Sequence, residues 1–467
     1  MEKKPLTTIV KYMYGFADFG FSFVSSIENY YMMFFLTDIA KLPLAGISAA
    51  TSLAYTLDTP SQAVYGALIS TLKPMRWGRN RSWFLLFPPL VMLTFILLFT
   101  NIGSPSVALV ICGTMLYLTN GTRSLSWLAN LNMINVLASN PDERSMLAAR
   151  RATWSAAAGI VFAYTVNPAI NTLTKTLNPV YAYTIVAGAA GAFYTLTSWF
   201  VFWITSGYEA TGAEAKAQAQ APGQQVTFMD IIRSAVQNPY LLILLLCDFF
   251  RQISATTVTS SAAYYFKYVA LNPNLMSPYQ VAYNFAGLIG ASLSAGLAKK
   301  YTTKRAAIIG MIGMIIGNLT GSIFGMNPIW TIACVSVARF FISLAQANLV
   351  ALYGDCVVYA RWKTGKDTSA FVMGSQTIPL KIGLTLRGII LPAVLAFVGF
   401  NPNIPPADAT DQVRQGIITM FMRIPAIGYL GTVLVLTFAF RLTNERVNEM
   451  QREIDEREAA AKLATAN

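Results

Sequence analysis

Histidine is absent from this chain of 467 residues, and its absence removes several kinds of chemistry. A histidine general base, a zinc site of the HExxH type and a histidine proton relay all require an imidazole. No acidic metal-binding motif takes their place in the sequence. The sequence therefore does not indicate an enzyme, and we expect neither a catalytic residue nor a bound metal or organic cofactor.

Cysteine and charge are also scarce. The four cysteines, Cys112, Cys247, Cys334 and Cys356, all fall within apolar runs, where free cysteine acts as a small hydrophobic residue. Their spacing supports neither a disulfide framework nor a metal cluster. Only 12% of the residues are charged, against roughly 25% in soluble proteins. So little polar surface cannot cover a globule in water, and we expect a membrane protein.

Long apolar runs are abundant. About 20 mostly apolar residues span a bilayer as a helix, and longer runs fit tilted or bent helices. We predict an all-α membrane protein with twelve transmembrane helices. The twelve segments are 12–36, 46–71, 82–101, 107–136, 147–167, 181–206, 239–268, 278–299, 304–325, 330–360, 371–398 and 415–441.

A polar segment divides these helices into six plus six. Residues 207–238 are rich in Ala, Gln and Gly, which is typical of a flexible linker, and 228–235 are predicted to form a short amphipathic helix. We predict an N-terminal half (1–206), a C-terminal half (239–441) and a charged tail (442–467). Related helix ends in the two halves, "YGALISTLKPMRWGRNR" and "AGLAKKYTTKR", indicate pseudo-symmetric repeats, which are typical of secondary transporters.

The net charge of +13 has a topological explanation. Most basic residues fall on one side of the twelve-helix map, while Lys41, Lys175, Lys267 and Arg414 fall on the other. The positive-inside rule places the basic side, and both termini, in the cytoplasm of an inner-membrane protein. No basic domain with interleaved aromatic residues indicates a nucleic-acid partner. We expect a monomer whose partners are the lipid bilayer and a small-molecule solute.

Charges within the predicted helices mark a candidate site, because such charges are costly and normally face the interior of the bundle. Asn120, Arg123 and Trp127 have the spacing of one helix face, and an indole ring suits stacking on a sugar. Ser22 lies on a polar stripe of the first helix, with Glu28 beside it. The remaining basic residues inside the predicted helices are Arg251, Arg339, Lys381, Arg387 and Arg423.

Two interpretations of these charges stay open. Either Asp58 or Glu28 neutralises Arg123 and simply locks two helices together, or these groups take part in binding a solute or ion. In the second half, Asp248 and Arg251 are spaced i, i+3 and can pair locally. Lys381 lies on a polar face of its helix.

Several stretches resemble the glycoside–pentoside–hexuronide:cation symporters. They are "YMYGFADFGFSFVSSIENYYMMFFLTD", "DTPSQAVYGALISTLKPMRWGRNRSW", "YYFKYV" and "DCVVYARWKTGKDTSAFVMGSQTIPLKIGLTLRG". The resemblance covers nearly the whole chain. It implies the major facilitator fold, two six-helix halves, alternating access and uptake of sugars or glycosides with Na⁺, H⁺ or Li⁺.

The resemblance implies roles for single residues, with departures at the cation site. Asp58 matches the first of two cation-site aspartates, and the second falls at Gln62. Arg123 stands where the melibiose carrier of that family has a cation-site Asp, and Ser22 stands where it has a sugar-binding Asp. The resemblance further implies solute contacts for Trp127, Arg151 and Lys381. The R-W-G-R and W-K-T-G motifs imply gating loops containing Arg76, Trp77, Gly78, Arg79, Trp362 and Lys363, with Asp355 nearby.

These departures predict an unusual mode of coupling. Arg123 would pair with Asp58 and replace a bound Na⁺, so that coupling to H⁺ through Asp58 or Glu28 is favoured over coupling to Na⁺. Around the membrane midplane, Arg123, Arg251 and Lys381 are expected to face Glu28, Asp58 and Asp248 and to line the solute site. With one of these acids protonated, the cavity would be net positive and would suit a hexuronide or sulfonated solute, because guanidinium binds such groups bidentately. The alternatives are a uniporter, a Na⁺-coupled symporter of a neutral glycoside, and a translocator of an amphipathic lipid or organic anion.

Overall fold

The computed structural model describes residues 4–71, 75–209, 238–365 and 369–466. The helix predicted at 228–235 lies outside this part, as does the side chain of Gln62. The described residues form two compact units. One unit contains those of 1–223, 259–281 and 385–417, and the other contains those of 224–258, 282–384 and 418–467.

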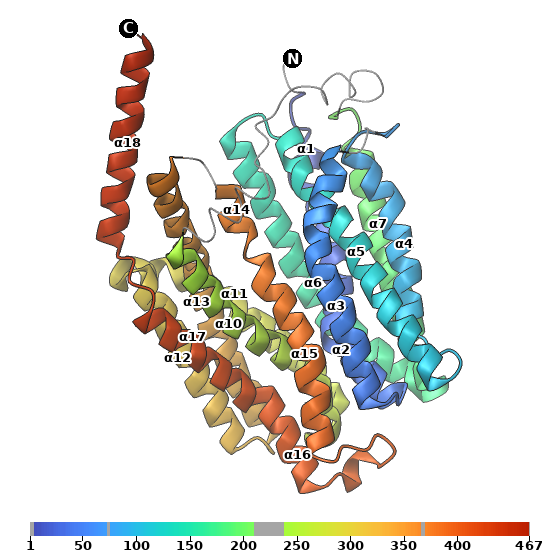
Figure 1. Ribbon diagram of the computed structural model, residues 1–467. Helices are drawn as coiled ribbons and strands as arrows, with labels where there is room; N and C mark the ends of the chain where they lie inside the picture. The colour runs from blue at the N-terminus through green and yellow to red at the C-terminus, as the bar shows by residue number, and fades with distance from the viewer. Residues whose placement is uncertain (1–3, 72–74, 210–237, 366–368, 467) are drawn as a thin grey trace. The chain divides into compact units, whose positions relative to one another are not determined.

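The first unit is built from the helices of the N-terminal part of the chain (Figure 1). They are α1 (Thr8–Met13), α2 (Phe16–Phe34), η1 (Phe35–Ile39), α3 (Leu44–Thr71), α4 (Arg81–Leu98), α5 (Pro105–Leu137), α6 (Pro141–Thr176) and α7 (Pro179–Ile204). From later in the chain it takes the end of α10 (Pro239–Tyr264), η2 (Tyr265–Val269), η3 (Pro273–Leu275), the start of α11 (Met276–Tyr301), the end of α15 (Thr377–Phe397), η4 (Pro406–Asp408) and most of α16 (Asp411–Ile418).

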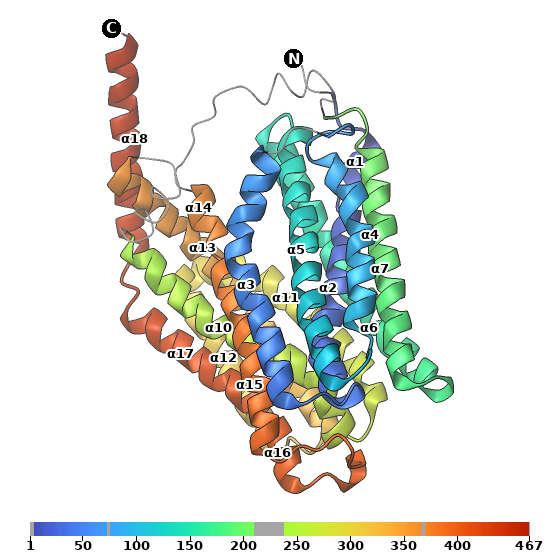
Figure 2. The same cartoon turned by 45° about the vertical axis from the view of Figure 1, so that its right-hand side comes forward.

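The second unit contains the remaining parts of α10, α11 and α15 (Figure 2). Its other helices are α12 (Thr303–Ile323), α13 (Pro328–Thr364), α14 (Ser369–Gly374), η5 (Thr419–Arg423), α17 (Ile424–Phe438) and α18 (Asn444–Ala466). Helix α12 packs against α13 and α17. The charged tail forms α18, which packs on α13, and its Met450 and Ile454 are buried.

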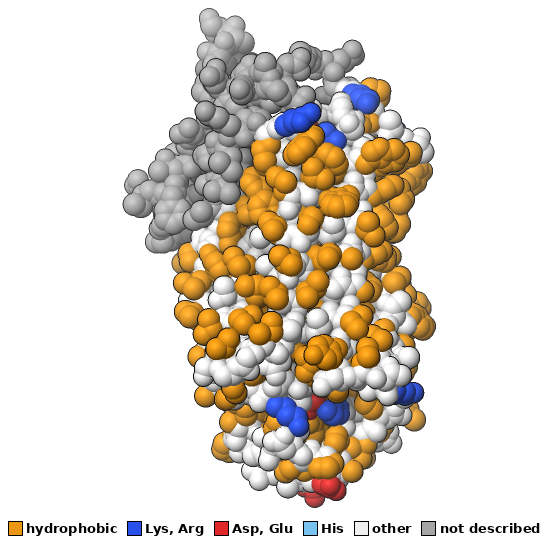
Figure 3. Space-filling view, turned by 90° about the vertical axis from the view of Figure 1, so that its right-hand side faces the viewer, with side chains coloured by type: hydrophobic (Ala, Val, Ile, Leu, Met, Phe, Trp, Pro, Cys, Tyr) orange, Lys and Arg blue, Asp and Glu red, His pale blue; other side chains and the backbone are white. Residues whose placement is uncertain are grey.

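The predicted fold class is confirmed. Each of the twelve predicted spans falls on helical residues, although 371–398 is divided by a turn between α14 and α15, and the described part of the chain contains no β-strand. Seven helical segments in that part are long and apolar enough to cross a membrane by length and composition alone. Helix α5 is long enough but is not among these seven, because polar side chains such as Asn120, Arg123 and Asn130 lower its hydropathy. Hydrophobic side chains are spread over the face drawn in Figure 3, and its few basic side chains lie near the two ends.

The helix starts follow directly from the sequence. Helices α5, α6 and α7 each begin with proline, whose fixed φ suits the first helical position and whose missing N–H is not needed there. The side chains of Asn140 and Asn178 accept hydrogen bonds from the first turns of α6 and α7. The boundaries of these long helices are therefore set by local chemistry.

Helix α2 lies in the centre of the first unit, in contact with both α6 and α7 (Figures 1 and 2). Gly20 permits the close crossing with α7. A Cβ atom at this position would lie 2.2 Å from Thr197 Oγ1 and 2.8 Å from Tyr194 Cα. Small residues at helix crossings allow backbones to approach in membrane proteins, where packing replaces the hydrophobic effect between helices.

The same turn occurs at the end of α2 and at the end of α10. Both helices finish in a five-residue π-helical segment, Phe35–Ile39 and Tyr265–Val269. Two residues beyond each segment, Lys41 and Leu271 both have a φ of 53°. The matching backbone hydrogen bonds are Ala40 N to Phe35 O (2.7 Å), Ala270 N to Tyr265 O (2.9 Å), Leu42 N to Leu36 O (3.0 Å) and Asn272 N to Phe266 O (3.0 Å). The stretches "FFLTDIAKLP" and "YYFKYVALNP" are thus a structural repeat that shares little sequence.

Candidate transport site

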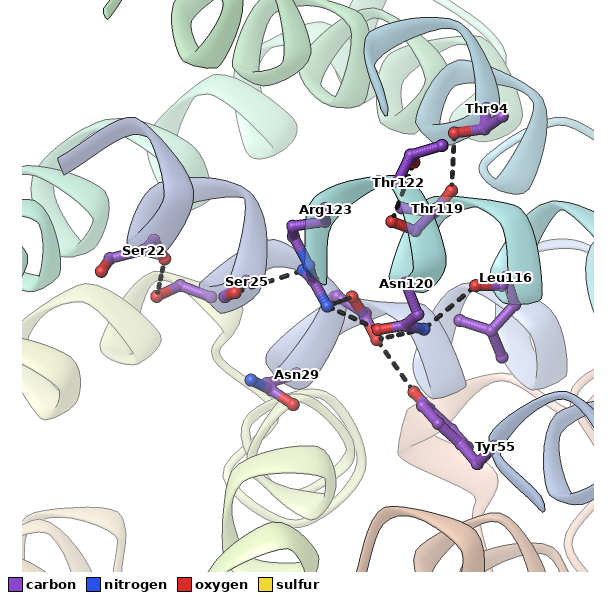
Figure 4. A network of polar contacts seen from close by, with 12 residues as sticks. Ser22, Ser25, Asn29, Tyr55, Thr94, Leu116, Thr119, Asn120, Thr122 and Arg123 are labelled. Atoms are coloured by element: carbon purple, nitrogen blue, oxygen red, sulfur yellow. Dashed lines mark hydrogen bonds and ion pairs between the residues drawn. The ribbon is translucent and has the colours of Figure 1, made fainter. Parts of the chain in front are cut away.

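Arg123 forms a buried ion pair with Glu28. Its Nη2 lies 2.7 Å from Glu28 Oε2, and the two residues are only 9% and 2% exposed. The guanidinium also donates to Ser25 Oγ at 3.2 Å and to Asn120 Oδ1 at 2.7 Å (Figure 4). The pairing of Arg123 with Asp58 suggested by the family pattern is therefore not the arrangement in the structure, although Asp58 is also buried, on α3.

Tyr55 connects this ion pair to a second arginine. Its hydroxyl donates to Glu28 Oε1 at 2.9 Å and accepts from Arg387 Nη2 at 2.7 Å. Arg387 Nη1 donates to Asn29 Oδ1 at 3.0 Å and to Ser260 Oγ at 3.1 Å. We name the group Glu28, Tyr55, Asn120, Arg123 and Arg387 the central network.

Arg387 is the most unusual member of the central network. It is fully buried, yet within the described residues its guanidinium contacts only neutral oxygen atoms and has no carboxylate within 4.0 Å. Its Nε has no hydrogen-bond partner in that part of the chain. Sequence reasoning noticed Arg387 as an intramembrane base but gave it no role, and it missed Tyr55, which lies in an ordinary apolar run.

Arg151 was predicted to contact the solute, but the structure pairs it with Asp18. Its Nε and Nη2 each lie 2.6 Å from one carboxylate oxygen of Asp18, in the forked geometry of a strong pair. Asn130 Nδ2 donates to the same carboxylate at 2.9 Å. This buried cluster joins α2, α5 and α6, and much of the Arg151 guanidinium is already used in it.

Ser22 and Trp127 lie on the elements that carry the central network. Ser22 Oγ is 2.6 Å from Ser155 Oγ, so it joins α2 to α6 (Figure 4 labels Ser22). Trp127 is half-buried, one turn after Arg123 on α5. The structure thus brings Asn120 and Arg123 together with Glu28, and places Ser22 and Trp127 on the same two helices.

Arg251 and Lys381 lie in the second unit. The predicted local pair is confirmed, because Arg251 Nε lies 2.5 Å from Asp248 Oδ1 and both side chains are buried. Lys381 is half-buried on α15.

The R-W-G-R motif forms a tight turn before α4. Gly78 has a φ of +112°, and the Met75–Gly78 backbone bridge closes the turn that contains Arg76 and Trp77. The carboxylate of Glu209 accepts hydrogen bonds from the backbone N–H groups of Asn80 and Arg81. An acidic group at the start of a helix satisfies unpaired N–H groups and complements the helix dipole. Glu209 lies 129 positions after Asn80, beyond the end of α7, so sequence reasoning could not find it.

The other predicted gating residues lie in two places, Arg79 before α4 and Asp355, Trp362 and Lys363 on α13. Arg79 is half-buried beside the turn before α4, and Asp355 is half-buried on α13. Trp362 Nε1 donates to Glu453 of α18 at 2.7 Å, and Lys363 lies over the ring of Tyr359. The W-K-T-G motif thus anchors the C-terminal helix.

Comparison with known proteins identifies the family of this chain. A sequence model of the family described as MFS/sugar transport protein matches residues 13–444, so the chain belongs to that family. It is 24% identical to the uncharacterized symporter YjmB of Bacillus subtilis (strain 168), over 97% of both chains. It is 24% identical to a putative sulfoquinovose importer of Escherichia coli (strain K12), over 96% of this chain and 93% of that protein. A glucuronide carrier protein homolog of Escherichia coli (strain K12) is 23% identical, over 96% and 95%.

Solved structures agree on the fold. The nucleoside transporter NupG superposes with a TM-score of 0.66 at 11% identity, covering 94% of this chain and 100% of that chain. A bacterial homolog of the human lysosomal transporter Spinster gives 0.60 at 13% identity, with 93% and 97% covered. The protein is a multi-pass membrane transporter of the major facilitator superfamily and of the sugar-transporting type. It is not an enzyme.

Proposed function

We propose that this transporter takes up a sugar-like solute that carries a carboxylate or sulfonate, and that its transport is coupled to H⁺ rather than to Na⁺. The observation that carries the proposal is the charge of the central network. Arg123 and Arg387 share the single carboxylate of Glu28, one directly and the other through Tyr55. Buried charges are costly unless paired, so this group favours the arrival of one further anion.

The same geometry disfavours a sodium site at Glu28. A hard cation needs several oxygen ligands with negative charge. One carboxylate oxygen of Glu28 already faces Arg123, and the other accepts from Tyr55. A proton needs only one oxygen atom. When an anionic solute binds the two guanidinium groups, protonation of Glu28 keeps the total charge of the network unchanged. Asp58 is the second candidate for this proton.

The relatives support the chemistry of the solute. One is named as a putative importer of sulfoquinovose, a sulfonated sugar, and another as a glucuronide carrier homolog. Arginine suits both kinds of anion, because its planar fork matches carboxylate and sulfonate oxygens. Trp127, which is half-buried on α5, is placed to stack on a sugar ring.

We also propose that the two halves of the chain alternate access to this site and that both termini face the cytoplasm. The distribution of basic residues supports the orientation. The ends of α2 and α10 that carry Lys41 and Lys267 then face the outside. This orientation is tested with single cysteines introduced at Lys41 and at Arg446. Intact cells are treated with a membrane-impermeant thiol reagent, and only the cysteine at position 41 is expected to react.

The experiment that tests the function is uptake into proteoliposomes of methyl glucuronide and methyl glucoside under imposed H⁺ or Na⁺ gradients. Selective uptake of the glucuronide, driven by H⁺ but not by Na⁺, is the expected result. The Arg123→Gln variant is expected to lose it. Uptake of the neutral glucoside driven by Na⁺ contradicts the proposal and supports a cation site rebuilt around Asp58.

A further inference from the structure

A pocket of about 210 Å³ lies in the first unit, where α2, α6 and α10 end. It is smaller than the roughly 300–1,000 Å³ of pockets for drug-sized ligands and suits a single ring. Its wall combines aromatic faces, side-chain amides and one ammonium group. The aromatic, amide and ammonium side chains among its lining residues are those of Tyr31, Phe34, Tyr183, Phe266, Asn167, Asn171 and Lys267. Aromatic faces and amides are suited to a sugar ring, and the ammonium to an anionic substituent.

Lys267 also belongs to a clamp between the two repeated turns. Its ammonium pairs with Asp38 of η1, and the hydroxyl of Tyr268 donates to the same carboxylate. The hydroxyls of Thr37 and Tyr264 are in contact next to this pair. We name Asp38, Lys267 and Tyr268 the outer clamp. It ties the end of α2 to the end of α10.

The two members of the ion pair differ in access. The Asp38 side chain is fully buried, whereas that of Lys267 is 29% exposed and lines the pocket. An ammonium group has three N–H donors, and Asp38 receives one of them. The cation can therefore meet a ligand in the pocket, but the carboxylate cannot.

We propose that this pocket is an entry subsite for the anionic ring of the solute, in which Lys267 exchanges Asp38 for the solute's carboxylate or sulfonate while Asp38 takes up a proton. The inference rests on the proposed function and adds a second binding position to it. One O–H bond forms on Asp38, with a proton from the outer solution. The clamp and pocket are neutral before the exchange, and they remain neutral after it.

The proton is required by the burial of Asp38. A buried carboxylate that loses its cation is strongly disfavoured. The remaining titratable groups that face Asp38 in the described residues are phenols: Tyr268 from η2, Tyr264 from α10 and Tyr183 from α7. A phenol supplies a hydrogen bond but no compensating charge, so protonation is the route that lets Lys267 leave.

The exchange also explains why the pocket and the clamp share a residue. A proton on Asp38 and an anion on Lys267 each favour the other, since their coupling is reciprocal. Loading of the pocket weakens the one ion pair of the outer clamp, so the arrival of solute and proton loosens the contact between the two turns. A neutral glycoside leaves that ion pair intact.

The test measures binding of methyl glucuronide to the purified full-length protein in a weakly buffered solution, with proton uptake followed by a pH indicator. We expect about one proton taken up per solute bound. Lys267→Gln is expected to weaken binding at least tenfold, and Lys267→Arg to restore most of it. Asp38→Asn is expected to bind the glucuronide but to take up fewer protons per bound solute, because only the proton on Glu28 is then gained. Lys175→Gln, an exposed lysine beside the pocket-lining Thr174, is the matched control and should bind normally.

Two outcomes overturn the inference: unchanged binding by Lys267→Gln, or a number of protons per bound solute that is the same in Asp38→Asn as in the wild type. Failure of the proposed function is distinguishable, because the wild type then prefers methyl glucoside. In that case the subsite is tested by site-resolved acylation of lysines. Acylation of Lys267 in Asp38→Asn is expected to be slowed by inorganic sulfate, while that of Lys175 is not. Equal acylation of Lys267 with and without sulfate excludes an anion subsite.

Discussion

The guanidinium of Arg387 donates a hydrogen bond of 2.7 Å to the hydroxyl of Tyr55, which joins residues 332 positions apart. The same hydroxyl donates to Glu28, so the charge of Arg387 is balanced only through a neutral phenol. This relationship makes Arg387 part of the network that contains Arg123. The central network therefore contains two guanidinium groups, those of Arg123 and Arg387, and one carboxylate, that of Glu28.

Replacement of Arg387 by glutamine should therefore reduce uptake of the acidic solute more than that of a neutral one. We expect a loss of at least tenfold for methyl glucuronide, which corresponds to about 1.4 kcal/mol. Arg387→Lys keeps the charge but loses the planar fork, so it should retain an intermediate rate. Initial rates in proteoliposomes measure this effect. Equal losses in Arg387→Gln and Arg387→Lys would indicate a structural role only.

Removal of the charge of Glu28 should destabilise the protein because Arg123 would remain buried without its partner. The expected cost of breaking a buried pair on one side is about 3–5 kcal/mol. The double variant Glu28→Gln/Arg123→Gln should recover most of this loss, because neither charge is then left alone. Thermal unfolding of Glu28→Gln, Arg123→Gln and the double variant, each purified in the same detergent, measures these differences in stability. A double variant as unstable as the sum of the single variants would show that the pair is not coupled.

Gly20→Ala should disturb the crossing of α2 and α7. The added Cβ would lie 2.2 Å from Thr197 Oγ1 and 2.8 Å from the backbone of Tyr194, and the backbone cannot move as a side chain can. Overpacking of this kind costs about 1–3 kcal/mol. Gly296→Ala is the matched control, because no atom lies within 4 Å of the added Cβ on α11. We expect a lowered midpoint of thermal unfolding for Gly20→Ala alone.

Glu209→Ala should loosen the turn that contains Arg76 and Arg79. Its carboxylate accepts from Asn80 N at 2.9 Å and from Arg81 N at 3.0 Å, and the start of α4 loses both acceptors in the variant. Limited digestion with trypsin, which cleaves after arginine, should become faster at Arg76 and Arg79. Glu143→Ala removes a comparable acceptor at the start of α6, where Ser139 N donates at 2.8 Å. This control should leave cleavage at Arg76 unchanged.

Much of the architecture could be predicted from local features. Apolar runs near the length of a bilayer located helical residues at all twelve predicted spans. The starts of α5, α6 and α7 at Pro105, Pro141 and Pro179 lie before the predicted 107, 147 and 181, because the apolar runs begin after the proline. The pair of Asp248 and Arg251 was predictable because three residues are almost one helical turn, so both side chains share a face. The polar stripe of Asn120 and Arg123 was predictable for the same reason.

The partner of each buried charge was decided by the tertiary structure. The sequence by itself determined that this protein is a helical membrane transporter and that Arg123 lies on the polar face of its helix. It could not determine that Arg123 pairs with Glu28, that Asp18 takes Arg151, or that Arg387 reaches Tyr55. Helical periodicity fixes which side chains share one helix face. The rotation and depth at which separate helices pack fix which faces meet, and those depend on contacts spread over the whole bundle.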